Sequence, residues 1–229
     1  MENNFILVLG SKPGSKLPNI DVSKVYSANG AAERALNYFD KFGKKELTCV
    51  CGAMEFFKNQ EVRSRIIKAK PNLIYFRSGK VNEENLDQYI TNTKFVSFSR
   101  NKQILFQSQF LRYKIFSILR AEWNHERDFK SKFKHLLKIF RQGGMLGAAT
   151  GLYSIILAKF ENPDKKILVS GIGIKSIGDS FYGTIGTTKR AHVDKKIFFD
   201  LDVSIKDNLS TTDQEMSEFC SIPLIKETF

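Results

Sequence analysis

His192 is the side chain of this sequence best suited to acid–base chemistry. An imidazole changes charge near neutral pH, so it can accept a proton from a reacting hydroxyl. His192 follows residues 174–191, a long irregular stretch rich in glycine, and such segments often close over active sites. We therefore predict a lid at 174–191 beside a general base, with a structural or exposed histidine as the alternative. The other two histidines, His125 and His135, lie in a basic helical run and are predicted to be surface residues.

Two glycine-bearing segments could bind phosphate through backbone N–H groups. Gly10 and Ser11 open the turn GSKPGS directly after the apolar run FILVL. Thr150 and Gly151 open an apolar helix behind several glycines, where the helix dipole and the first N–H groups attract anions. Neither segment has the glycine pattern of a dinucleotide-binding or Walker loop. The respective alternatives are a plain turn and close packing of small residues between helix and sheet.

Asp200 and Asp202 form a DxD sequence, which binds a divalent cation in many sugar-nucleotide transferases. Apolar residues recur at every fourth position from Val193 to Ile205, which predicts one amphipathic helix over 193–206. Residues two apart on a helix point about 200° away from each other. Because two carboxylates placed in this way could not share one ion, we predict no metal site.

Strands and helices alternate along the chain, and this alternation indicates the fold class. Strands are predicted at residues 5–9, 24–30, 46–52, 72–79, 94–99 and 165–173, with helices at 31–43, 55–70, 82–90, 108–141 and 152–160. The pattern predicts an α/β protein, a Rossmann-like and mostly parallel sheet with helices on both faces, in a single domain over 1–229. Such sheets bind ligands beyond the carboxyl ends of their strands. The expected site therefore lies at the strand ends GSKPGS, SANG, CGAM and SGIG.

The net charge of +12 and the sequence pI of about 9.5 favour an anionic partner. A phosphorylated small molecule, an anionic membrane and nucleic acid all meet this condition, but no zinc-finger or RNP pattern supports nucleic acid. Basic residues cluster over 112–141, where a solvated helical face is predicted. Aromatic residues in the same region recur at helical spacing and are predicted to face the core.

The odd number of cysteines, without ligand-like spacing, predicts thiols that are neither paired nor bound to metal. Cys49 and Cys51 lie in an apolar stretch and are predicted to be buried. The N-terminus lacks a signal-peptide pattern, and no run approaches the roughly 18 apolar residues of a membrane span. These features predict a cytoplasmic protein.

In their order and spacing, these segments resemble the bacterial CMP-sialic-acid-dependent sialyltransferases and the related Kdo transferases. GSKPGS stands at that family's G-N-G-P-S-like turn, and Asn29 at the asparagine that ends its second strand. Ala149-Thr150-Gly151 stands at its [ST]-[ST]-G step, and Ser170-Gly171-Ile172-Gly173 at its C-G-I-D-like corner. His192-Val193-Asp194-Lys195 reproduces its H-x-x-K-like motif. The resemblance extends over nearly the whole chain through short motifs.

The resemblance implies an inverting, metal-independent transfer of an acidic sugar, sialic acid or Kdo-like, from a CMP-sugar donor. The acceptor would be a glycan or glycolipid, no further cofactor would be needed, and the oligomeric state stays open. His192 would be the general base, and Tyr182 in the lid would hydrogen-bond the leaving phosphate. The basic surface could steer the donor or contact the inner face of an anionic membrane. The residues implied to contact the donor are Gly10, Ser11, Asn29, Thr150, Gly151 and Gly171.

Three positions depart from the family pattern, because Ser11, Gly52 and Gly173 stand where it has Asn, Asn and Asp. The departures favour a second hypothesis, a non-catalytic module of the same fold that binds a nucleotide or a sugar phosphate. A third hypothesis, a basic RNA-binding protein, would require salt-sensitive RNA affinity tied to residues 112–141.

Overall fold

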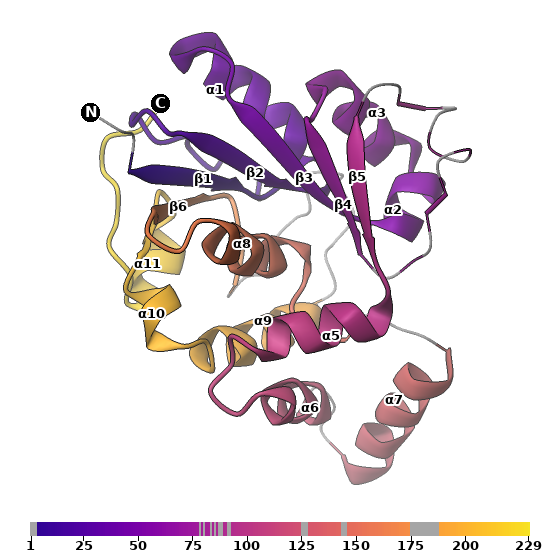
Figure 1. Cartoon of the computed structure of the whole chain (residues 1–229). Helices are drawn as coiled ribbons and strands as arrows, with labels where there is room; N and C mark the ends of the chain where they lie inside the picture. Colours follow the sequence, from indigo (N-terminus) through magenta and orange to yellow (C-terminus); the bar gives the residue numbers. More distant parts are fainter. Residues whose placement is uncertain are drawn as a thin grey trace.

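A seven-stranded sheet whose neighbouring strands all pair in parallel forms the centre of the protein (Figure 1). This arrangement confirms the predicted α/β class, a Rossmann-like parallel sheet with helices on both faces. The computed structural model describes residues 4–77, 79, 81, 82, 84, 86, 89, 90, 93–124, 128–142, 146–174 and 188–229. For residues 139, 140, 142 and 188–190 it describes only the backbone.

The strands follow the order β5-β4-β3-β2-β1-β6-β7 across the sheet. The chain therefore adds strands outward from β1 to β5 and then returns to the other side of β1. The strands are β1 (Phe5–Leu9), β2 (Lys24–Ala28), β3 (Glu46–Gly52), β4 (Leu73–Arg77), β5 (Lys94–Phe98), β6 (Lys166–Ser170) and β7 (Leu209–Thr211).

Helices cover both faces of the sheet. In Figure 1, α1 (Arg34–Phe42), α2 (Ala53–Lys58) and α3 (Gln60–Ala69) lie on one face, and α8 (Thr150–Glu161) lies on the other. Beyond α8 lie α5 (Arg100–Ser108), α6 (Ile115–Trp123) and α9 (Thr188–Phe199), with α7 (Phe129–Gln142) at the periphery. The structure also describes the 3₁₀ helix η1 (Asn29–Glu33), α10 (Val203–Lys206) and α11 (Gln214–Cys220).

The uninterrupted apolar run of β1 reflects a strand that is buried on both faces. Ile6 and Val8 belong to the core cluster that contains the buried residues of α8 and α9. Leu7 and Leu9 point the other way, into the cluster that contains residues of α1 and α3. Successive side chains of a strand alternate between faces, so a central strand between two layers of helices needs apolar residues at every position.

The order of the strands reverses between β1 and β6, which makes this the topological switch point of the sheet. In open α/β sheets, ligands bind in the crevice outside the carboxyl ends of the strands at such a point. Gly10 follows β1 and Gly171 follows β6, so both predicted donor-binding glycines lie at this position. The topology therefore agrees with the predicted position of the site at this edge.

Two predicted helices are broken in the structure. The predicted helix over 55–70 divides at Asn59, whose extended backbone and side-chain oxygen cap the start of α3 by accepting from the N–H groups of Glu61 and Val62. The predicted helical stretch over 108–141 also divides, because residues 109–114 turn and Lys114 takes a positive φ of 52°. A capping asparagine and a positive φ both end a helix locally. The short helix predicted over 82–90 lies largely outside the described residues.

The amphipathic helix predicted over 193–206 is also interrupted, because α9 ends at Phe199. Backbone hydrogen bonds hold the interruption: the N–H of Arg112 donates to the carbonyl of Asp200 at 2.7 Å, and the N–H of Asp202 donates to that of Phe110 at 3.0 Å. These long-range bonds replace helical ones. The spacing of apolar residues within one segment cannot show that a distant segment will take over its backbone hydrogen bonds.

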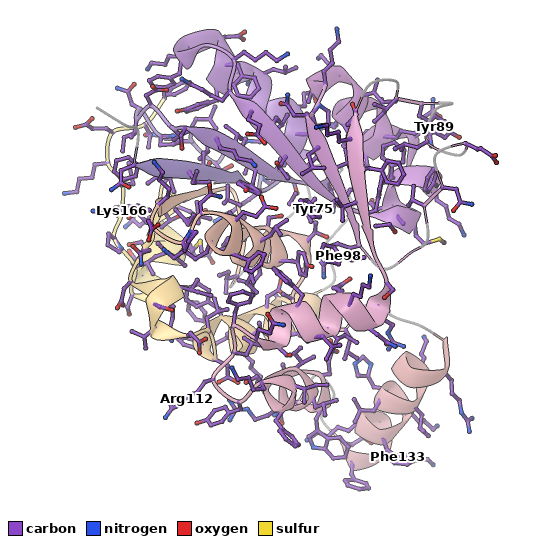
Figure 2. The ribbon with its side chains drawn as sticks, viewed as in Figure 1. Tyr75, Tyr89, Phe98, Arg112, Phe133 and Lys166 are labelled. Carbon is purple, nitrogen blue, oxygen red and sulfur yellow. The ribbon has the colours of Figure 1, made fainter. Side chains whose placement is uncertain are left out.

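The prediction that the aromatic residues of 110–140 face the core is wrong for four of the described ones, of which Tyr113 is 45% exposed. Phe116 is 71% exposed, Phe129 is 74% exposed and Phe133 is 53% exposed. Figure 2 shows Phe133 pointing away from the molecule at the outer side of α7. Helical spacing identifies an apolar face, but it does not state what covers that face.

All three cysteines are free and buried, as predicted for Cys49 and Cys51. Burial raises the pKa of the Cys49 thiol to about 12 and that of the Cys220 thiol to about 12. These side chains therefore serve as small apolar residues of the core. Within the described part of the chain, no helix combines the length and the apolar character needed to cross a bilayer.

We expect Gly10→Ala to destabilise the protein, because a Cβ at this position would lie 2.2 Å from the carbonyl oxygen of Gly171. Backbone atoms must move to relieve such a contact, at a cost of about 1–3 kcal/mol. The midpoint of urea unfolding measures the effect. Gly52→Ala is the matched control, since its Cβ would meet no atom closer than 3.5 Å. Equal midpoints for the two variants would contradict the close approach of the two turns.

Candidate functional site

The turns that follow β1 and β6 contact each other through their backbones at the switch point. The N–H of Gly10 donates to the carbonyl of Ser170 at 2.8 Å, and that of Lys12 donates to Gly171 at 2.9 Å. Gly171 takes a φ of 77°, a conformation that favours glycine. Gly10 and Gly171 therefore allow the two backbones to approach each other closely. Ser11, between the bonded residues, is partly exposed at the same edge.

A buried guanidinium, that of Arg34, lies beneath these turns. It donates to the carbonyl of Gly10 at 2.6 Å, to that of Ser15 at 2.9 Å and to the hydroxyl of Ser170 at 3.0 Å. Within the described part of the chain, its hydrogen bonds go to neutral oxygens only. Burial lowers the pKa of Arg34 to about 10, so the group keeps its charge at neutral pH. The switch point thus contains a fixed positive charge.

Sequence analysis missed Arg34, although one signal was present. Arg34 is the first residue of α1, and the positive end of a helix dipole disfavours a cation there. A cation that occupies this position has to be stabilised by partners from elsewhere in the fold. The Arg34 bonds to the β1 and β6 turns supply those partners.

Asn29 lies at the carboxyl end of β2, where the chain enters η1 with a positive φ of 50°. Its side-chain oxygen accepts a hydrogen bond of 3.4 Å from the N–H of Gly52, at the end of β3. Asn29 is partly exposed, so it contributes a polar side chain to the same edge as Gly10.

The start of α8 reaches the carboxyl edge beside the end of β4. Arg77, only 2% exposed, donates to the Thr150 hydroxyl at 3.3 Å and to the Ala148 carbonyl at 2.7 Å. Its guanidinium also lies over the Tyr153 ring, 4.3 Å from the centroid. Sequence analysis missed Arg77, although a charged residue at the end of the apolar run LIYF was the available signal. Arg77 fixes Thr150 and adds a second buried cation to this edge.

Close packing against Ile172 favours a glycine at position 151. A Cβ at this position would lie 3.2 Å from the side chain of Ile172, in the turn after β6. The start of α8 therefore packs closely against the turn after β6, and a larger side chain at this position would not fit without movement of Ile172. This packing brings the N-terminus of α8 against the corner that contains Gly171.

Three side chains from three different helices hold the residues that lead into α8. The N–H of Gly147 donates to Glu122 of α6 at 3.0 Å. The N–H of Ala148 donates to Gln107 of α5 at 2.9 Å, and the N–H of Ala149 donates to Asp194 of α9 at 2.7 Å. All three accepting side chains are buried. The anions next to this helix start therefore include carboxylates of the protein itself, and the backbone left for a ligand begins at Thr150.

His192 lies on α9, two residues before Asp194. The bond from Ala149 to Asp194 brings this part of α9 to the start of α8. Residues two apart on a helix point about 200° away from each other, so the His192 ring faces away from Ala149, and it is exposed. Its role as a general base remains a prediction. Tyr182 and residues 175–187 of the predicted lid lie outside the described residues, whereas 188–191 belong to α9.

The DxD sequence and His135 have partners of their own. Asp200 accepts two hydrogen bonds from Arg120, at 2.6 and 2.7 Å, and it lies just past the end of α9 rather than within a helix. The prediction that His135 is a surface residue is wrong: its ring is 3.1 Å from the buried carboxylate of Glu122. His125 lies outside the described residues. No group of three potential metal-binding side chains occurs within the part of the chain that the structure describes.

We expect Asp194→Ala to lower the free energy of unfolding by about 1–3 kcal/mol, because the N–H of Ala149 loses its acceptor. Asp194→Asn keeps an oxygen at this position and should cost less. Urea unfolding monitored by circular dichroism measures both variants. If the two variants were equally stable, the bond between Asp194 and Ala149 would not hold α9 to the start of α8.

We compared the chain with known proteins and found no relative. The chain matched no protein-family model, no curated protein and no solved structure. The geometry of the carboxyl edge and the order of the sequence motifs are therefore the grounds for a functional proposal.

Proposed function

We propose that the protein is an inverting glycosyltransferase that moves an acidic sugar from a CMP donor to a glycan or glycolipid. The observation that carries the proposal is the hydrogen bond from Ala149 to Asp194. It brings the part of α9 that bears His192 next to the helix start that bears Thr150, while the exposed His192 ring itself faces away from Ala149. In the resembling family, the corresponding histidine is the base and the corresponding helix start holds the nucleotide.

The charges of the edge support an anionic donor. Arg34 and Arg77 are buried cations at the ends of β1 and β4, and a positive charge in a low-dielectric environment acts more strongly than one in water. The N-terminus of α8 adds the positive end of a helix dipole, which the Asp194 carboxylate bound to the N–H of Ala149 offsets in part. A nucleoside monophosphate bound between the Gly10 turn and Thr150 would lie within this field.

In the proposed reaction, the acceptor hydroxyl attacks the anomeric carbon of the sugar while the bond from that carbon to the CMP oxygen breaks. The imidazole of His192 takes the proton of the hydroxyl, and CMP leaves with the electron pair of the broken bond. Tyr182 would donate a hydrogen bond to the phosphate as its charge grows. A monophosphate leaving group gathers less charge than a diphosphate, so the reaction as proposed involves no metal ion.

We expect His192→Ala to lower the transfer rate by about 10²–10⁴-fold, the usual contribution of a general base. Hydrolysis and transfer assays with CMP-sialic acid and CMP-Kdo measure the rate, and a thermal shift with CMP measures binding. CMP should stabilise the variant as much as the unaltered protein. Phe199→Ala is the control, since Phe199 is an exposed residue at the other end of α9.

Three outcomes would contradict parts of this proposal. Full turnover by His192→Ala would remove the histidine from the mechanism. Stabilisation by CMP without hydrolysis of either donor would favour the non-catalytic binding module. No response to CMP, alongside a response to UDP, GDP, NAD or S-adenosylmethionine, would overturn the donor class.

A further inference from the structure

The helices α6 and α7 together present an exposed surface that is both apolar and basic. We define the α6–α7 surface by its exposed apolar residues and the exposed lysines beside them: Phe116, Phe129, Phe133, Leu137, Lys130, Lys134 and Lys138. Figure 1 places α7 at the periphery, away from the sheet. The exposed phenylalanines are therefore not required to cover the central core.

The apolar part of this surface is continuous across both helices. A groove of about 680 Å³ is lined by Tyr113, Phe116, Leu119, Arg120, Trp123 and Leu136. Phe129 packs edge-on against Trp123, with ring centroids 5.5 Å apart. Phe133 lies one helical turn from Phe129 and from Leu136, so its side chain extends the same patch. Monomeric proteins rarely expose so many large apolar side chains together unless a partner covers them.

The charge of α7 is strongly one-sided. The sequence of α7, FKSKFKHLLKIFRQ, contains five Lys or Arg residues and no Asp or Glu. Basic side chains also lie over aromatic rings of α6 and of the turn before it. The Lys132 nitrogen is 5.7 Å from the centroid of the Trp123 ring, and the Arg120 guanidinium is 5.2 Å from that of the Tyr113 ring. A helix with Phe and Leu on one face and Lys beside them has the composition of helices that lie in the interface of a bilayer.

We propose that the α6–α7 surface binds an anionic lipid bilayer, with its phenylalanines among the acyl chains and its lysines at the headgroups. Charge complementarity favours this occupant over a second copy of the chain, because two such surfaces would place like charges face to face. The groove combines three aromatic side chains with Leu119, Leu136 and Arg120. Because bases also stack on aromatic rings, RNA binding is the alternative that the experiment has to separate from lipid binding. The proposal does not depend on the proposed transferase activity.

Vesicle sedimentation with the full chain tests this proposal. The probes are phosphatidylcholine vesicles with and without about one third phosphatidylglycerol, at low and high salt. We expect binding only to the anionic vesicles, and weaker binding at high salt, because salt screens the lysines. Equal binding to both vesicle types, or to neither, would overturn the proposal.

Two variants assign the binding to this surface. Phe129→Ser with Phe133→Ser should weaken binding at least tenfold, because both rings lose their place among the acyl chains. Lys134→Gln with Lys138→Gln should weaken it by about fivefold for each lysine. The controls are Met54→Ser and Lys58→Gln, which change an exposed apolar residue and an exposed lysine of α2, on the opposite face of the sheet. Both controls should bind as the unaltered protein does.

Thermal unfolding of each variant separates loss of binding from loss of folding, and only variants that melt as the unaltered protein does are compared. Vesicle binding that survives both double substitutions would overturn the assignment to α6 and α7. A dimer in sedimentation velocity that dissociates on Phe129→Ser with Phe133→Ser would assign the surface to self-association instead. RNA binding lost with the lysine pair, in the absence of vesicle binding, would assign it to nucleic acid.

Discussion

The arrangement of the helices beneath the sheet depends on three hydrogen bonds to consecutive backbone N–H groups, those of Gly147, Ala148 and Ala149. Apolar packing is non-directional and tolerates sliding, whereas a buried polar group that loses its partner costs free energy outright. The acceptors come from α6, α5 and α9. Each of these helices is therefore held at one defined place relative to the start of α8, and α8 in turn packs on the sheet.

This constraint connects the two regions to which we assign roles. Helix α6 contributes Glu122 to the loop before α8 and Phe116 to the exposed surface, and it packs against α9, which bears His192. The carboxyl edge and the α6–α7 surface are thus built on the same helical layer. The buried cations Arg34 and Arg77 give the edge its positive field, while the lysines of α7 give the periphery a separate one. The basic side chains behind the net charge of +12 therefore gather in at least two separate places, the carboxyl edge and α7.

Predictions from the sequence were accurate where burial alone dictates the pattern. Six of the seven strands, the parallel arrangement and the positions of Gly10, Asn29 and Gly171 at strand ends all follow from apolar runs that end in small or polar residues. The predictions were wrong where a residue distant in sequence competes for the backbone. The division at Asp200 depends on bonds to residues 110–112, and the partly buried state of His135 depends on Glu122.

The sequence by itself determined the class of fold and the edge at which strand ends with small and polar residues meet, because alternating strands and helices can bury their apolar faces in few ways. Only the tertiary structure decided which polar groups meet at that edge. Arg34 and Arg77 are ordinary arginines in sequence, and they become buried cations through partners 19 to 136 residues away along the chain. The tertiary structure also decided that Phe116, Phe129 and Phe133 face outward. A periodic pattern specifies that a helix has an apolar side, but the packing of the remaining chain specifies whether protein covers it.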